Sequence, residues 1–320
     1  MAPTRRELLA TAGAVALATK LSRAQGASAS PRGQTWCNLQ GSGLGLKQGD
    51  RILDLSKAAK QMRVQVPANT DELIQGKHAD GLQKVISAKG PTVAEKDARF
   101  APCITNPEKI IMLGFNYRAH AIERKVPIPT APVVFNKYNN ALNAHGGTIK
   151  LPAKMAKQFD YEVELQVIIG KRAREVSEAD ALDHVFGYAS GNDFSARDLQ
   201  YRDGKASQFM LGKTSDGFMP IGPFLVGAEV VGDPQKLAIE CRVNGEQRQS
   251  SNTSDMIFTC AQIISYCSRV FTLEPGDLIS TGTPSGVIQG KPEAEQIWLK
   301  AGDKIACSVE KCGELRFDLS

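Results

Sequence analysis

The chain has 320 residues, of which 42% are hydrophobic and 23% charged, a composition typical of a soluble globular protein and not of a disordered one. The formal net charge is +5, but residues 1–29 hold four basic side chains and one acidic one, which leaves +2 for the rest. No basic stripe remains that would favour nucleic acid as a partner.

Residues 1–29 have the features of an export signal. Arg5 and Arg6 form a twin-arginine pair, and an apolar run from Leu8 to Ala18 follows that is too short to span a bilayer. Ala27-Ser28-Ala29 then offers small residues for cleavage. An amphipathic N-terminal helix is the alternative interpretation. Export by the twin-arginine route predicts a periplasmic or secreted protein with no other contact with a membrane.

Residues 30–105 are predicted to form a small N-terminal domain, followed by a catalytic domain over 106–320. A short strand is expected at 51–55 and helices at 69–74 and 82–88. Prolines 102 and 107 mark the predicted boundary. We find no residue pattern with chemical meaning in the first of these domains.

The seven cysteines have an odd count and include no Cys-x-x-Cys pair, which argues against a zinc cluster. An exported protein can form disulfides, but the spacing of these cysteines identifies no pair. We therefore expect most of them to be small, buried, apolar residues.

A strand at 110–114 precedes a short predicted helix within residues 116–124. His120 and Glu123 are three residues apart on this helix and so share one side of it. Prolines end the helix, and one or two turns are unstable alone, so the segment suits a mobile lid. His120 can take a proton from water while Glu123 orients its ring. A solvated surface helix is the alternative.

A strand is predicted over residues 159–170, after another at 133–137. Side chains in a strand repeat every two residues, so Asp160, Glu162 and Glu164 share one face, and Val163 and Leu165 can face a core. Neighbouring carboxylates repel each other, and Mg²⁺, Mn²⁺ or Ca²⁺ between them would relieve that. An edge strand with a solvated acidic face is the alternative.

Asp193 stands where a predicted strand at 185–190 gives way to a short helix, a frequent position for a metal ligand. A helix is also expected to start at Ser177. Arg197 can donate two parallel hydrogen bonds to a substrate carboxylate, or pair with Asp198. Lys213 lies in a glycine-containing turn, where it can stabilise an enolate or serve as a surface lysine.

The C-terminal third is predicted to hold a hairpin over 237–248 and an apolar helix over 256–271. A strand from 278 then runs into a glycine- and proline-containing turn, where the Thr283 hydroxyl can bind an oxygen-rich ligand. The tail, 303–319, alternates as terminal strands. The chain has neither a Gly-x-Gly-x-x-Gly pattern nor a Walker loop.

Six motifs follow one another between residues 108 and 317. They are Gly114-Phe115-Asn116-Tyr117 with His120 and Glu123, Phe135-x-Lys137, Asp160-Tyr161-Glu162-Val163-Glu164, Asn192-Asp193 with Arg197 and Gln200, Gly212-Lys213, and Thr281-Gly282-Thr283-Pro284. In this order they resemble the fumarylacetoacetate hydrolase family. The resemblance implies an α+β fold of mainly mixed and antiparallel sheet, and a homodimer.

The resemblance also implies roles for ten residues. Glu162, Glu164 and Asp193 would bind Mg²⁺ or Mn²⁺, with Ca²⁺ possible in a crystal. A second group would contact the substrate: Tyr117, Arg197, Gln200 and Thr283. The catalytic residues would be His120, Glu123 and Lys213.

The activity that the resemblance implies is metal-dependent hydrolysis of a carbon–carbon bond in a 2,4-diketo acid such as an acylpyruvate. Decarboxylation or isomerisation of a 2-oxo acid such as oxaloacetate is the alternative, because the same metal residues serve it. The third possibility is a periplasmic protein that binds a keto acid without turning it over. Residues 138–147 depart from the serine-rich turn of many members, which leaves the acyl group of the substrate open.

Overall fold

The computed structural model describes residues 30–202 and 207–320, so the candidate export signal lies outside the described residues. Residues 32–320 form one compact unit. Among the residues described, no helix is long and apolar enough to cross a membrane.

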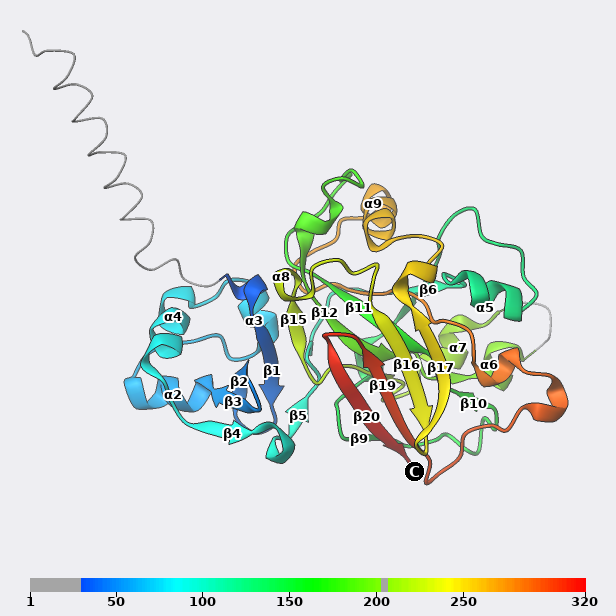
Figure 1. Cartoon of the computed structure of the whole chain (residues 1–320), viewed down its shortest axis with the longest axis horizontal. Helices are drawn as coiled ribbons and strands as arrows, with labels where there is room; N and C mark the ends of the chain where they lie inside the picture. The colour runs from blue at the N-terminus through cyan, green and yellow to red at the C-terminus, as the bar shows by residue number, and fades with distance from the viewer. Residues whose placement is uncertain (1–29, 203–206) are drawn as a thin grey trace, which may run out of the picture. The chain divides into compact units, whose positions relative to one another are not determined.

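An eleven-stranded sheet forms the largest part of this unit (Figure 1). Its strands follow the order β4-β3-β2-β1-β15-β12-β11-β18-β6-β7, with β5 paired to β1. All neighbours are antiparallel except β18 and β6. The strands are β1 (Thr35–Leu39), β2 (Gly43–Gln48), β3 (Arg51–Asp54), β4 (Thr92–Ala94), β5 (Phe100–Ala101), β6 (Ile110–Gly114), β7 (Val133–Lys137), β11 (Val163–Ile169), β12 (Val185–Asn192), β15 (Leu225–Gly227) and β18 (Leu278–Ser280).

The region before residue 105 contributes β1 to β5 and three helices, α2 (Leu55–Met62), α3 (Thr70–Ile74) and α4 (Ala79–Ala88). Asp54 and Asn69 cap α2 and α3 by accepting hydrogen bonds from backbone N–H groups of the first turn. Pairing of β1 with β15 makes this region part of the large sheet. The division into domains at 105 stays a prediction.

A five-stranded sheet packs against β11 and β12 (Figure 1). Its order is β17 (Glu246–Asn252), β16 (Ala238–Val243), β19 (Lys304–Val309), β20 (Gly313–Leu319) and β9 (Gly147–Ile149). The predicted hairpin joins β16 to β17 through Asn244 and Gly245, whose positive φ angles of 53° and 84° suit a type I′ turn. The remaining strands form two two-stranded sheets. In one, β10 (Phe159–Asp160) pairs with β13 (Ser195–Ala196), and in the other β14 (Met219–Pro220) pairs with β8 (Leu142–Asn143).

The remaining α-helices are short except for α9 (Cys260–Val270), which begins at a capping box between Thr259 and Gln262. The others are α5 (Arg118–Glu123), α6 (Arg197–Gln200), α7 (Phe209–Lys213) and α8 (Ala228–Val231). The predicted α+β fold, dominated by mixed and antiparallel sheet, is therefore confirmed.

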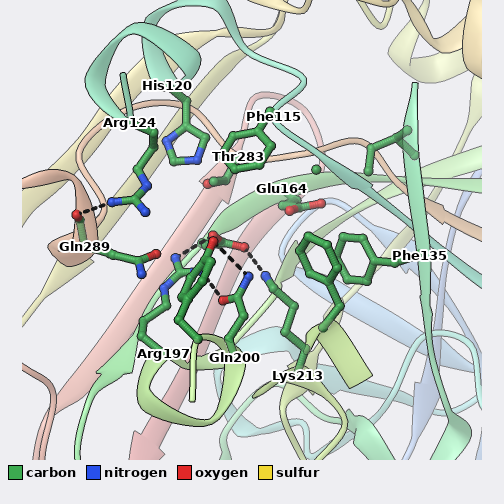
Figure 2. Close-up of a pocket in the computed structure, with 15 residues that line it drawn as sticks. Phe115, His120, Arg124, Phe135, Glu164, Arg197, Gln200, Lys213, Thr283 and Gln289 are labelled. Atoms are coloured by element: carbon green, nitrogen blue, oxygen red, sulfur yellow. Dashed lines mark hydrogen bonds and ion pairs between the residues drawn. The ribbon is translucent and has the colours of Figure 1, made fainter. Parts of the chain in front are cut away.

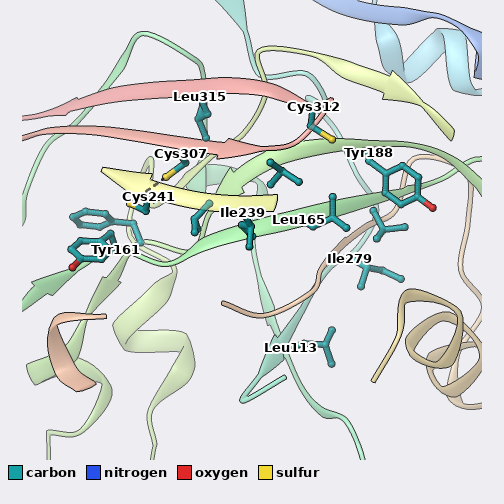
Figure 3. Close-up of a cluster of buried hydrophobic side chains, with 14 of the residues drawn as sticks. Leu113, Tyr161, Leu165, Tyr188, Ile239, Cys241, Ile279, Cys307, Cys312 and Leu315 are labelled. Carbon is teal, nitrogen blue, oxygen red and sulfur yellow. Dashed lines mark hydrogen bonds between the residues drawn. The ribbon is translucent and has the colours of Figure 1, made fainter. Parts of the chain in front are cut away.

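The main hydrophobic core lies between the two sheets (Figure 3). From β11 it contains Val163, Leu165, Val167 and Ile169, as the alternation predicts. Each of the seven cysteines is buried and free, and the Sγ atoms of Cys241 and Cys307 lie 3.7 Å apart on the adjacent strands β16 and β19. Burial raises the pKa of several of these thiols, that of Cys260 to about 12, so they stay protonated at neutral pH.

One expectation from the sequence holds in part and another is wrong. The strand predicted over 159–170 forms as β10 and β11 with an interruption after Asp160, and β11 lies inside the large sheet with every residue buried, which excludes the alternative of an edge strand with a solvated face. The helix expected from Ser177 does not form. The Ser177 hydroxyl does bond Asp180 as a cap would, but β12 begins at Val185 and leaves room only for a 3₁₀ turn, Ala181–His184.

Leu165→Ala is expected to lower the free energy of unfolding by about 2–5 kcal/mol, because it leaves a cavity in the main core. Leu211→Ala is the control, since Leu211 is 47% exposed, and its cost should stay within about 0.5 kcal/mol. Urea unfolding of both variants measures the difference. Equal losses would contradict the assignment of the core.

Candidate active site

Three buried carboxylates meet at one end of the β11–β12 ladder. Glu162 directly precedes β11, Glu164 is its second residue, and Asp193 directly follows β12. Val163 pairs with Asn192, and the Asp193 N–H donates to the Glu162 carbonyl at 2.9 Å, which brings the three side chains together. One oxygen of each lies within 4.8 Å of the others. The structure thus gathers the three residues predicted as metal ligands.

Cations from three other segments surround two of these carboxylates. Lys213 Nζ lies 2.7 Å from Glu162 Oε2 and 2.5 Å from Asp193 Oδ2. Lys137 Nζ lies 2.6 Å from Asp193 Oδ1, and an Arg197 nitrogen lies 2.6 Å from Glu162 Oε1. Burial alone would raise the pKa of Glu162, but Arg197 and Lys213 outweigh it and hold that pKa far below its usual range.

Glu164 differs, because no described lysine, arginine or histidine forms an ion pair with it. Its Oε2 accepts hydrogen bonds from the Ser280 hydroxyl and, at 2.9 Å, from the Gly282 N–H. Burial raises its pKa well above the usual range, and the nearby Asp193 and Glu162 raise it further. A divalent cation among the three carboxylates would supply the missing positive charge. Hard carboxylate oxygens suit Mg²⁺ or Mn²⁺, so the donor set fits such an ion.

Arg197 is held by protein groups on every side. Its Nε donates to Asp160 Oδ2 and one terminal nitrogen to Gln200 Oε1, each at 2.9 Å, in addition to the pair with Glu162. Asp160 also accepts the Ile288 N–H at 2.9 Å, so it ties a distant loop to Arg197. The alternative pairing of Arg197 with Asp198 is wrong, because Asp198 accepts the Lys157 N–H instead.

The predicted lid helix, α5, places His120 at the pocket. Its Nδ1 lies 3.1 Å from Glu123 Oε2, and the Gly286 N–H fixes the other Glu123 oxygen at 2.8 Å. The ring of Phe115 stacks on the imidazole, with centroids 5.8 Å apart. Phe115 has a φ of 52°, a conformation uncommon for a bulky residue. No described residue hydrogen-bonds His120 Nε2, which leaves it for water or substrate.

The pocket between the lid and the carboxylates spans about 360 Å³ of space, part of which is open to solvent (Figure 2). Its lining includes seven of the ten predicted site residues: His120, Glu162, Glu164, Arg197, Gln200, Lys213 and Thr283. Glu123 stands behind His120, and Asp193 is covered by Lys213 and Lys137. Thr283 is itself bonded to Val163 and Gln249.

Tyr117 is the exception among the predicted residues. Its side chain is fully buried in the main core and is not part of the pocket lining. Its backbone forms an isolated β-bridge with Met256, which turns this side chain away from the lid and into the core. A contact between Tyr117 and substrate therefore finds no support in the geometry.

Several lining residues were not predicted. Phe135 and Phe209 stack with centroids 4.4 Å apart and form an aromatic wall beside Lys213. The others are Leu113, Gly114, Phe115, Arg124, Tyr201 and Gln289. Phe135, Phe115 and Gly114 fall within the motifs that resemble the family, so those motifs could have pointed to them. Nothing in the local sequence indicates that Gln289 or Phe209 lines a pocket.

Comparison with known proteins places these residues in a family. The model described as fumarylacetoacetate (FAA) hydrolase C-terminal matches residues 109–320. The mitochondrial oxaloacetate tautomerase fahd2 of Xenopus laevis is 39% identical over 278 residues, which cover 85% of this chain and 84% of that protein. The 2,4-didehydro-3-deoxy-L-rhamnonate hydrolase of a Sphingomonas strain is 44% identical over 75% of this chain and 84% of its own length.

Solved structures show the same fold. Fumarylacetoacetate hydrolase from Exiguobacterium antarcticum superposes with a TM-score of 0.77 at 33% identity, covering 90% of this chain and 99% of that one. Fumarylpyruvate hydrolase from Pseudomonas aeruginosa, in complex with Mn²⁺ and pyruvate, gives 0.60 at 34% identity, covering 69% and 91%.

Addition of Mn²⁺ is expected to raise the melting temperature of the protein, because a ligand that binds only the folded state stabilises it by about 2.7 kcal/mol at 100 times its Kd. Glu164→Gln should lose most of this shift. Glu178→Gln, at an exposed position outside the pocket, should keep it. A thermal scan with and without Mn²⁺ measures the effect, and an unchanged shift in Glu164→Gln would contradict the assigned ligand.

Proposed function

This chain belongs to the fumarylacetoacetate hydrolase family, whose members are enzymes that act on keto acids, and we propose that it is a divalent-metal-dependent hydrolase of a 2,4-diketo acid. One observation carries the proposal. The His120–Glu123 pair faces the same pocket as Glu162 and Glu164, so a base for water and a carboxylate site for a metal border one substrate.

Glu162, Glu164 and Asp193 would hold the metal, which when bound acts as a Lewis acid on the 2-oxo end of the substrate. The presence of Mn²⁺ and pyruvate in the related fumarylpyruvate hydrolase supports this choice of ligand and ion class. Lys213 forms ion pairs with Glu162 and Asp193. Its ammonium group is therefore placed to stabilise negative charge on the substrate oxygen.

His120 acts as the general base. Glu123 at Nδ1 fixes the ring and stabilises its protonated form, so Nε2 takes a proton from water. The hydroxide attacks the C4 carbonyl, the C3–C4 bond breaks, and its electron pair leaves as the enolate of the 2-oxo acid fragment. The proton on His120 then passes to C3, which gives one carboxylic acid and one 2-oxo acid.

Keto–enol tautomerisation of a 2-oxo acid is the second candidate, because the tautomerase of Xenopus laevis matches 85% of this chain. His120 would move a proton between C3 and oxygen with no attack by water. Incubation with an acylpyruvate and, separately, with oxaloacetate, each with Mg²⁺ and with identification of products, separates the two. Release of pyruvate and a carboxylic acid supports hydrolysis, whereas interconversion of enol and keto oxaloacetate without fragments supports tautomerisation.

Export by the twin-arginine route and assembly as a homodimer, both expected from the sequence, belong to the same proposal. The export pattern in residues 1–29 and the family resemblance support them. Cell fractionation of the full chain tests the first, and light scattering of the protein from residue 30 tests the second.

Glu123→Ala is expected to lower kcat for acylpyruvate hydrolysis by about 10²–10⁴-fold, the usual contribution of general base catalysis, because His120 loses its orienting partner. Loss of the acylpyruvate absorbance measures the rate. Glu178→Ala is the control for removal of a carboxylate outside the pocket. Full hydrolytic rate in Glu123→Ala would exclude the pair from the mechanism.

A further inference from the structure

Arg124 is the one cation of the pocket lining that has no carboxylate partner among the described residues. The two other lining cations with fixed charge, Arg197 and Lys213, are both neutralised by buried carboxylates. Glu123, next to Arg124 in the chain, is occupied by His120 and the Gly286 N–H. A full positive charge therefore faces the pocket uncompensated.

A chain of hydrogen bonds holds this guanidinium in place. Arg124 follows the end of α5 and is half-buried, and one terminal nitrogen donates to the Gln289 carbonyl. The Gln289 N–H donates to Asp160 Oδ2 at 3.2 Å, and the same oxygen accepts Arg197 Nε. The acceptor for Arg124 is a neutral backbone carbonyl, so the remaining N–H groups of the guanidinium stay available to a ligand.

The two ends of the pocket differ in character (Figure 2). Arg124 and Gln289 lie side by side at one end, where the side-chain amide of Gln289 has no described hydrogen-bond partner. The opposite end carries Phe135, which forms an aromatic pair with Phe209 by stacking on it. The rings of the aromatic pair offer no hydrogen bond to a carboxylate, and Lys213 beside them is already paired with Glu162 and Asp193, whereas the Arg124 guanidinium fork matches a carboxylate with two parallel hydrogen bonds.

We propose that Arg124, assisted by Gln289, binds a second carboxylate at the end of the substrate remote from its 2-oxo acid group. The preferred substrates are then 2-oxo or 2,4-diketo acids that carry two carboxylates. This proposal rests on the proposed function, because it assumes that the 2-oxo acid end lies at Glu162 and Glu164. It makes Arg124 a specificity-determining residue that takes no part in proton transfer.

Binding of unreactive probes tests the proposal apart from turnover. Titration calorimetry with Mn²⁺ present compares 2-oxoadipate with 2-oxohexanoate, which has the same chain length and lacks the second carboxylate. We expect the wild type to prefer 2-oxoadipate by about 10- to 100-fold, the range for a hydrogen bond to a charged group. Arg124→Gln should bring this ratio close to one.

Lys125→Gln is the matched control, because it removes the next charge along the chain from an exposed side chain outside the pocket. It should retain the preference for 2-oxoadipate. A wild type without this preference, or an equal loss of affinity for both probes in Arg124→Gln, would overturn the proposal. The second result would assign Arg124 to the 2-oxo acid end.

A kinetic comparison separates this proposal from the proposed function. 2,4-Dioxoheptanedioate and 2,4-dioxoheptanoate differ only in the terminal carboxylate. A fall in the ratio of their kcat/KM values in Arg124→Gln, through KM, supports both proposals. If neither compound is cleaved while 2-oxoadipate binding depends on Arg124, hydrolysis is wrong and the assignment of Arg124 stands.

Discussion

Four carboxylates and three cations, all of them buried side chains, are packed together at the centre of this molecule. Transfer of an unpaired charge into such a site costs several kcal/mol, so each side chain depends on the placement of its neighbours. Lys137, Arg197 and Lys213 form ion pairs with Asp160, Glu162 and Asp193 and so compensate their charge. Glu164 alone lacks a cation among the described residues, and a divalent cation at the three carboxylates would correct this imbalance.

The large sheet makes that arrangement possible. β11 supplies Glu164, the adjacent β12 leads into Asp193, and β18 on the other side brings Ser280. The cations come from shorter elements that end at the same place: Lys137 closes β7, and Lys213 closes α7. Residues within or next to strands thus provide the anions and Lys137, while short helices provide Arg197, Lys213 and the candidate lid.

Most elements could be predicted from alternation, caps and turn residues, because those signals are local. The alternative of a solvated edge for the acidic strand could not be excluded from the local pattern, for a physical reason. A period of two shows that Glu162 and Glu164 share a face, but it cannot show that Lys213 and Arg197 fold over that face. The prediction of Glu162 and Glu164 as metal ligands came from the family motifs, since the local pattern alone left the alternative open.

Residues that long-range contacts bring to the pocket could not be predicted from the sequence. Gln289 reaches the pocket because Asp160 holds its backbone from 129 residues away. Tyr117 shows the opposite error, since a position beside the lid in the sequence suggested a substrate contact, and its side chain belongs to the core.

Asp160 carries a consequence for the interpretation of sequence variants. It is fully buried and lines no part of the pocket, yet it joins Arg197 to the backbone at Ile288 and Gln289. A mutational screen scored only by turnover would group a change at Asp160 with changes in the reacting residues. Allele classification in this protein therefore needs a measurement of folding beside each measurement of rate.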